Sequence, residues 1–116
     1  MQQVQIDIGQ MQNRLRKQQK VLSERIEVES KKAKPSHLAN PDRADLAYDY
    51  AYRARRLSLL DQLEDRLGEV KKALKRIDEG MYGICTNCGK TILPERLEAL
   101  PYAELCIECQ RKERAG

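Results

Sequence analysis

The sequence predicts a mainly α-helical protein: a long antiparallel coiled-coil hairpin, then a small C-terminal module built on four cysteines and a short terminal helix. Charged residues make up 34% of the 116 residues and aromatic residues only 4%, which is typical of long helices with narrow apolar seams. Two segments repeat apolar residues at steps of three and four and are joined by a loop bracketed by prolines. The four cysteines follow as two C-x₂-C pairs.

The first helix is expected over residues 2–33, which contain no proline. Its first apolar residues have the 4-3-4 spacing of a coiled-coil seam: Val4, Ile8, Met11 and Leu15. Farther along, Gln18 interrupts this seam, Leu22 resumes it and Glu29 ends it. Pro35 is expected to stop the helix, because the residue before a proline disfavours the helical conformation.

The second helix is expected from about Asp42 to about Glu79. Asn40 is a candidate N-cap, and Pro41 suits the first helical position because its missing N–H has no intrahelical partner there. Its seam consists of eight apolar residues: Leu57, Leu60, Leu63, Leu67, Val70, Leu74, Ile77 and Met81. Gly80 then predicts the end of the helix, since glycine readily adopts the left-handed conformation that closes one.

These elements predict two domains. The hairpin occupies residues 1–80, with its tip loop at about 34–41, and the cysteine module occupies residues 81–116. At 1.5 Å per residue, each arm of the hairpin spans about 50 Å. Both seams are denser near the cysteine module, so the tip is expected to be a thin finger that buries little apolar surface.

The cysteines form the most specific motif of the chain. Seventeen residues separate the two pairs, whose members are Cys85, Cys88, Cys106 and Cys109. Two C-x₂-C turns of this kind complete the tetrahedral shell of one structural Zn²⁺ per chain, and four protein ligands leave no open position for catalysis. We therefore expect no enzymatic activity. The alternative, two redox-active C-x-x-C motifs, lacks the βαβ context of such motifs.

Charge and hydropathy limit the possible partners and the location of the chain. The formal net charge is +4, and a four-thiolate zinc site would lower it by about two, which is too close to neutral to imply nucleic-acid binding. The sequence shows no N-terminal apolar signal region and no long apolar run, so neither export nor membrane insertion is expected. A cytoplasmic location follows, where reduced cysteines are more often metal ligands than disulfides.

Acidic residues gather at the expected start of the second helix: Asp42, Asp45 and Asp49. Such residues are ordinary in a first helical turn because they complement the helix dipole. At the end of a long finger they could also reach a metal ion or a basic surface in a partner's cleft, and carboxylate oxygens suit Mg²⁺. The nearby arginines are most simply a solvated helix surface: Arg53, Arg55 and Arg56.

Short motifs around the cysteines and at the tip of the hairpin match those of a known family. Around the cysteines they are Gly83-Ile-Cys85-Thr-Asn-Cys88-Gly89, Arg96-Leu97-Glu98-Ala99 and Cys106-Ile-Glu-Cys109. At the tip, Asp42-x-x-Asp45-x-Ala47 forms a D-x-x-D-x-A motif at the family's distance from the first cysteine. On these residues the chain resembles the DksA/TraR C4-type zinc-finger family over about residues 34–110.

The resemblance implies a bacterial transcription regulator that binds RNA polymerase and does not bind specific DNA sequences. Members of the family insert the coiled-coil finger into the secondary channel of the polymerase, near the active-site Mg²⁺, and so modulate initiation. By this resemblance Asp42, Asp45 and Ala47 would be the effector residues at the tip. The cysteines would only hold the base in shape.

Two features depart from the family pattern. The N-terminal portion is shorter, so a reduced base is expected. Ungapped alignment also puts Glu69, Leu100 and Gln110 where the family has basic residues that face the alarmone ppGpp, and none of the three offers the charge that a pyrophosphate needs. Lys72 and Arg111 could substitute only if the register shifted. We therefore expect little ppGpp synergy.

Three other readings remain open. A Gre-type cleavage factor shares the acidic finger, but its second domain is β-rich and zinc-free. A nucleic-acid-binding zinc finger is disfavoured by the near-neutral charge and because Tyr48, Tyr50 and Tyr52 point to opposite sides of a helix, so they form no stacking platform. A purely structural dimerising coil would give the tip residues no role beyond helix stability.

Overall fold

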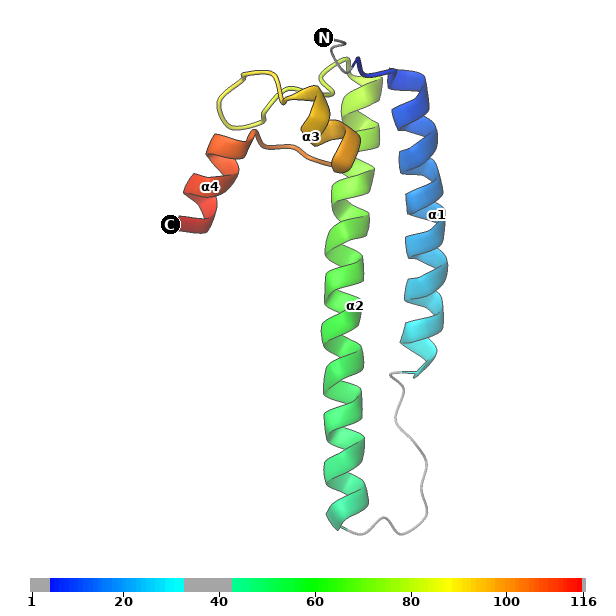
Figure 1. Cartoon of the computed structure of the whole chain (residues 1–116). Coiled ribbons are helices and arrows are strands. Elements are labelled where there is room, and N and C mark those ends of the chain that lie inside the picture. The colour runs from blue at the N-terminus through cyan, green and yellow to red at the C-terminus, as the bar shows by residue number, and fades with distance from the viewer. Residues whose placement is uncertain (1–4, 33–42, 116) are drawn as a thin grey trace. The chain divides into compact units, whose positions relative to one another are not determined.

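The computed structural model describes residues 5–32 and 43–115. This part of the chain contains four helices: α1 (Ile8–Lys32), α2 (Arg43–Asp78), α3 (Pro94–Ala99) and α4 (Ile107–Ala115) (Figure 1). The chain divides into two compact units, which we call the base (Met1–Gln19 and Gly68–Gly116) and the finger (Lys20–Leu67). Helices α1 and α2 contribute to both units and run antiparallel within each, which confirms the predicted class of fold.

Helix α1 begins later than the sequence pattern suggested. Residues 5–7 are not helical, and the helix starts at Ile8. The side-chain Oδ1 of Asp7 accepts a hydrogen bond from the backbone N–H of Gln10 at 3.2 Å, and its backbone carbonyl accepts one from Met11 at 3.0 Å. Asp7 is therefore the N-cap, a signal that the predicted start at residue 2 overlooked. Val4 lies outside the described residues.

Helix α2 ends where the sequence predicts. Gly80 has a φ of 74°, and its N–H donates to the carbonyl of Ile77 at 3.1 Å. The N–H of Met81 donates to the carbonyl of Arg76 at 2.8 Å, which completes a Schellman motif. At the other end, the predicted cap residues Asn40 and Pro41 and the tip loop lie outside the described residues.

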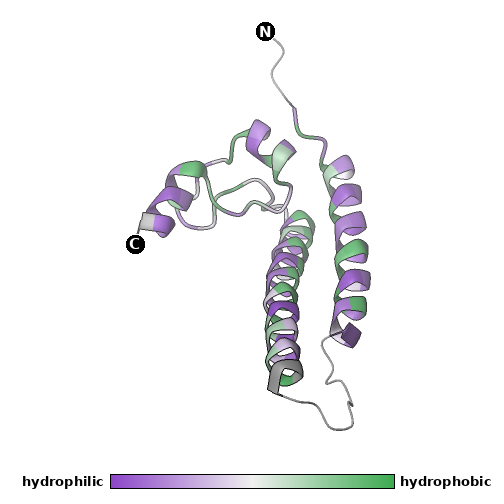
Figure 2. Ribbon diagram, turned by 60° about the horizontal axis from the view of Figure 1, so that its bottom comes forward, coloured by the Kyte–Doolittle hydropathy of each residue, from purple (hydrophilic) through white to green (hydrophobic). Residues whose placement is uncertain are grey.

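Apolar side chains pack between α1 and α2, but they are fewer than predicted. In the base, Met11 and Leu15 of α1 and Val70 and Ala73 of α2 are buried. In the finger, the buried apolar residues of α2 are Leu60 and Leu63. Figure 2 shows how much of both helices is hydrophilic. In the described ranges, no helix combines the length and the apolar character needed to cross a membrane.

Three residues assigned to the apolar seams are exposed, and their prediction was wrong: Ile8, Leu57 and Met81. Ile8 is the first residue of its helix, and Met81 follows the glycine that ends α2, so helical periodicity no longer places its side chain. Leu57 precedes two further steps of three, to Leu60 and Leu63, and such steps rotate successive residues around the helix. It therefore falls outside the stripe that faces α1.

The finger also contains a buried acidic residue. Glu29 was expected to end the seam, yet it is only 7% exposed. Its carboxylate accepts a hydrogen bond from Nη1 of Arg56 at 2.7 Å. Arg56 was expected to belong to a solvated surface, so both expectations were wrong for one reason: an interhelical ion pair replaces an apolar contact at this level.

Candidate functional site

The first cysteine pair lies on a tight hairpin of the base. The N–H of Cys85 donates to the carbonyl of Lys90 at 2.8 Å, and the N–H of Gly89 donates back to the carbonyl of Cys85 at 3.0 Å. A single antiparallel bridge between Ile84 and Thr91 closes the hairpin. Gly89 has a φ of 79°, a conformation that side chains with a Cβ rarely adopt, so glycine permits the chain to turn directly after the pair.

The second pair lies at the start of α4. Cys106 immediately precedes this helix and Cys109 is in its first turn, where the N–H of Gln110 donates to the carbonyl of Cys106 at 2.9 Å. The N–H of Thr86, next to the first cysteine, donates to the carbonyl of Glu104 at 2.9 Å. This hydrogen bond joins two segments of the chain and brings the hairpin and the start of α4 together.

The four sulfur atoms converge to within 4.8 Å of one another: those of Cys85, Cys88, Cys106 and Cys109. The Sγ atoms of Cys88 and Cys106 are 3.8 Å apart. Sulfur ligands about 2.3 Å from a tetrahedral zinc ion lie about 3.8 Å from one another, so the donor set fits one Zn²⁺. The predicted zinc site is thus assembled from two segments far apart in the sequence.

The crowded sulfurs are held in unlike electrostatic environments. Burial raises the pKa of the Cys85 thiol, but N–H groups of Cys106, Cys88 and Asn87 outweigh it and bring that pKa to about 6. Asn87 Nδ2 lies 3.4 Å from the sulfur of Cys109 and lowers its pKa, yet the neighbouring sulfurs and burial raise it to about 11. Four thiolates at this spacing repel one another, and a divalent cation removes that repulsion.

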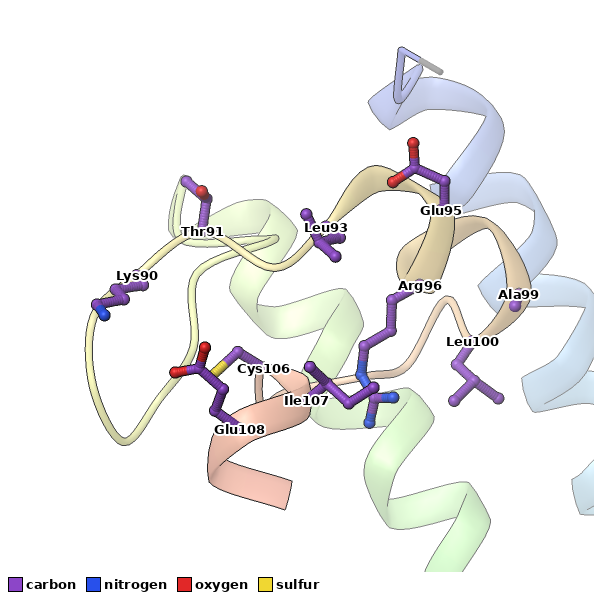
Figure 3. A pocket seen from close by; sticks show the side chains of 10 residues that line it. All are labelled: Lys90, Thr91, Leu93, Glu95, Arg96, Ala99, Leu100, Cys106, Ile107 and Glu108. Atoms are coloured by element: carbon purple, nitrogen blue, oxygen red, sulfur yellow. The ribbon is translucent and has the colours of Figure 1, made fainter. Parts of the chain in front are cut away.

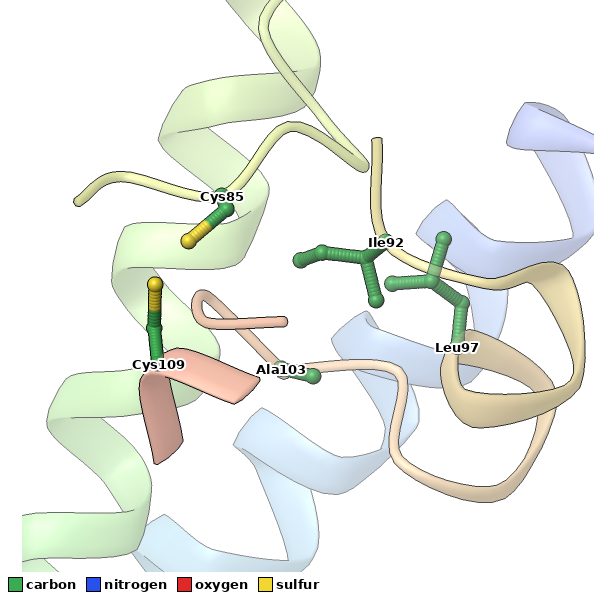
Figure 4. Packing of buried hydrophobic residues seen from close by; sticks show 5 residues of the cluster. All are labelled: Cys85, Ile92, Leu97, Ala103 and Cys109. Atoms are coloured by element: carbon green, nitrogen blue, oxygen red, sulfur yellow. The ribbon is translucent and has the colours of Figure 1, made fainter. Parts of the chain in front are cut away.

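A small apolar cluster supports the metal centre (Figure 4). Its buried members are Cys85, Ile92, Leu97, Ala103 and Cys109. Half-buried Ile6, Tyr82 and Leu105 pack against the cluster. With so few apolar residues of its own, the cysteine module is expected to depend on metal coordination for much of its stability.

Hydrogen bonds between distant segments complete the base, and the sequence patterns did not reveal them. Tyr82 donates from its hydroxyl to the carbonyl of Pro101 at 2.8 Å, and burial raises the pKa of Tyr82. Arg14 of α1 donates from Nη2 to the carbonyl of Glu98 at 3.0 Å. Arg76 of α2 donates to the carbonyl of Ile84, just before the first cysteine. Both long helices are therefore bonded to the cysteine module within the base.

A mainly apolar groove of about 460 Å³ lies beside Cys106 (Figure 3). The side chains of Leu93 and Ile107 in its lining are exposed, and Lys90 and Glu108 add opposite charges. Leu100, one of the three positions at which the family pattern has a basic residue, also lines the groove. Arg96 and Glu95 also line the groove, so its two basic side chains are matched by two acidic ones.

The predicted tip residues are only partly covered by the structure. Asp42 and the side chain of Asp45 lie outside the described residues, although Asp45 belongs to the first turn of α2. Ala47 is exposed. One turn later, Asp49 accepts a hydrogen bond from Arg53 at 3.2 Å, so its carboxylate is already engaged within the finger. The assignment of a role to Asp42, Asp45 and Ala47 therefore stays a prediction.

Comparison with known proteins gives the family context of this site. Residues 80–115 match the model of the prokaryotic DksA/TraR C4-type zinc finger. General stress protein 16O of Bacillus subtilis is 48% identical over 44 residues, which are 38% of this chain and 27% of that protein. The RNA polymerase-binding transcription factor DksA of Escherichia coli is 34% identical over 70 residues, 60% of this chain and 46% of that protein. The chain thus spans half or less of the length of these curated relatives.

Solved structures extend the likeness to most of the chain. Transcription factor DksA2 from Pseudomonas aeruginosa matches with a TM-score of 0.77 and 32% identity, over 93% of this chain and 83% of that one. The DnaK suppressor protein from Agrobacterium tumefaciens matches with a TM-score of 0.63 and 29% identity, over 93% and 95% of the two chains. The similarity therefore includes the helices as well as the cysteine module.

Proposed function

This chain belongs to the DksA/TraR family of C4-type zinc-finger proteins, and from that premise we propose that it is a transcription regulator that binds RNA polymerase. The match to DksA2 over 93% of the chain carries the proposal, because it covers the finger as well as the zinc module. A relative named as an RNA polymerase-binding transcription factor supports the choice of partner. This chain would act in the bacterial cytoplasm, where RNA polymerase works.

We further propose that the finger enters the secondary channel of the polymerase and modulates initiation. In this proposal Asp42, Asp45 and Ala47 act near the active-site Mg²⁺, and the base stays outside the channel. The four sulfurs would then serve the fold alone. A zinc shell saturated by protein ligands offers no open position to a substrate, which supports a regulator that is not an enzyme.

The proposal is tested by measuring binding and promoter output together. Purified protein is titrated against RNA polymerase, and abortive and full-length transcripts from a ribosomal-type promoter are counted over the same concentration range. Binding with a matching change in transcript yield supports the proposal. Steep salt-dependent binding to free DNA or RNA, with no binding to the polymerase, would instead support a nucleic-acid-binding zinc finger.

The response to ppGpp gives a second expected outcome. Glu69, Leu100 and Gln110 carry no positive charge, so ppGpp is expected to change the promoter effect of this protein by less than about twofold. Transcription is measured with and without ppGpp, for the wild type and for the Lys72→Ala/Arg111→Ala variant. A larger effect of ppGpp that requires the protein would contradict the prediction. If that effect also persists in the Lys72→Ala/Arg111→Ala variant, the nearby basic residues do not explain it.

A further inference from the structure

The sulfur atoms of the metal site have different kinds of hydrogen-bond donor beside them. Cys85 begins its C-x₂-C turn, and the backbone N–H groups of Asn87, Cys88 and Cys106 lie close enough to favour its thiolate form. Backbone groups of this kind are supplied by the fold, whichever side chains the residues carry. The charge on Cys85 is therefore stabilised without the help of a side chain.

Cys109 is placed differently, because it lies in the first turn of α4. The N–H of Gln110 donates to the carbonyl of Cys106 at 2.9 Å, and α4 continues to Ala115. The amides that follow Cys109 therefore point back along the helix to carbonyl groups. The donor that the structure places at its sulfur is a side chain instead: Nδ2 of Asn87, 3.4 Å from Sγ and 22 residues away in the sequence.

This contact links the two cysteine pairs, because Asn87 lies in the first C-x₂-C turn and Cys109 belongs to the second. The reverse orientation of the amide would aim Oδ1 at a sulfur that carries negative charge, so Nδ2 is the atom that faces it. We propose that Asn87 is a positioning residue of the zinc site. Its amide N–H donates to the Cys109 thiolate, holds that sulfur in place for the metal and slows the release of zinc.

The surroundings of Cys109 give this donor its importance. Cys109 is only 7% exposed and belongs to the apolar cluster, so few water molecules stabilise its charge. It also lines an open hollow of about 450 Å³, which Asn87 lines as well. Glu104 and Glu113 add negative charge to this hollow, and Lys112 adds one positive charge. A neutral donor at the sulfur offsets part of the negative charge of the four thiolates, which the nearby carboxylates increase.

The expected effect follows from what such donors contribute in other metal sites. A hydrogen bond to a ligand keeps the ligand oriented, and its loss typically lowers metal affinity about 10–100-fold. Asn87 is exposed, so water replaces part of the lost bond and the lower end of that range applies. Asn87→Ala should therefore bind zinc about tenfold more weakly than the wild type and release it about tenfold faster.

The matched control is Thr86→Val, at the neighbouring position of the same turn. Thr86 donates from Oγ1 to the carbonyl of Glu104 at 3.3 Å, so this variant also loses a bond between the hairpin and the segment before α4, but none to a sulfur. Zinc release into excess chromogenic chelator is timed, and affinity is measured by competition. Thr86→Val should stay within about twofold of the wild type. If Asn87→Ala retains zinc as firmly as Thr86→Val, the proposal is overturned.

Asn87→Asp separates the N–H group from the size of the side chain. Aspartate has nearly the same shape, but it places a negatively charged oxygen where the donor was. This variant should release zinc faster than Asn87→Ala, whereas release at the wild-type rate would show that the side chain only fills space. Each variant is first loaded with one zinc ion per chain and melted, which separates faster release from failure to fold.

The hydrogen bond itself can be observed after zinc is replaced by an NMR-active cadmium isotope. Spin coupling passes from the metal through a sulfur to a proton that is hydrogen-bonded to that sulfur. The wild type should show coupling between cadmium and the side-chain amide protons of Asn87. No such coupling, in a protein whose backbone amides around Cys85 do show it, would overturn the proposal even if a variant could not be loaded with metal.

Discussion

Asp45→Asn is expected to abolish the effect on promoter output while affinity for RNA polymerase stays within about twofold of the wild type. The substitution removes one negative charge but keeps the size of the side chain and one of its oxygens. A carboxylate that acts on the active-site Mg²⁺ or on groups around it needs that charge. The accompanying loss of helix-dipole stabilisation costs about 0.3–1 kcal/mol, too little to unfold a helix of 36 residues packed against its neighbour.

Asp49→Asn is the matched control for this prediction. It makes the same change one turn farther along α2, at a carboxylate that is bonded to Arg53. We expect it to retain the promoter effect. Transcript yield is measured at saturating protein, and affinity is measured separately by competition. If Asp45→Asn binds and acts like the wild type, the acidic start of α2 is only a favourable helix terminus.

Cys85→Ser is expected to prevent the base from folding, and chelation of zinc should do the same. The Cys85 side chain is part of the buried cluster and supplies one of the four sulfurs. Structural zinc contributes about 10–16 kcal/mol in zinc-finger peptides at pH 7, as much as the whole stability of a typical domain. Zinc content is measured with a chromogenic chelator, and cooperative melting is followed by circular dichroism.

Lys90→Gln provides the control for the zinc prediction. Its side chain is exposed on the same hairpin, and the backbone carbonyl that accepts the bond from Cys85 is unchanged. This variant should keep one zinc ion per chain and the wild-type melting curve. Unchanged cooperative melting of the wild type after complete zinc removal would show that the apolar cluster is sufficient and that the metal has a different role.

The spacing of apolar residues predicted the two long helices but only part of their buried face. Leu63 and Val70 lie one heptad apart on α2 and are buried as expected, and so is Leu15 on α1. Leu57 and Leu60 both fit the repeating pattern of apolar residues, yet Leu57 is exposed and Leu60 is buried. Only the position of the partner helix accounts for this difference. Burial in a two-helix seam is therefore a property of the register, which spacing on one helix does not specify.

Glu29 illustrates the same limit. On the sequence alone a carboxylate at a seam position indicates that the seam has ended, because unpaired charges are rarely buried. The partner that makes its burial possible is 27 residues away, across the tip loop. No local pattern in either helix connects the two residues.

The zinc site was more predictable than its support. Cysteine spacing is a local signal, whereas the bond from Arg14 to Glu98 joins residues 84 positions apart. Asn87, whose amide contacts the sulfur of Cys109, lies inside the first C-x₂-C turn. Its position next to Cys88 could have marked it as a candidate donor to the metal ligands, because polar groups inside such turns are close to the sulfurs.

In the proposed complex, the start of α2 lies near the active-site Mg²⁺ of RNA polymerase. Replacing that Mg²⁺ with Fe²⁺ in the complex and adding peroxide generates hydroxyl radicals at the active site, and these cleave whatever backbone is nearby. We expect cleavage of this protein around residues 42–50 and none in the zinc module at residues 80–115. Cleavage confined to the zinc module, or no cleavage of a protein shown to be bound, would contradict it.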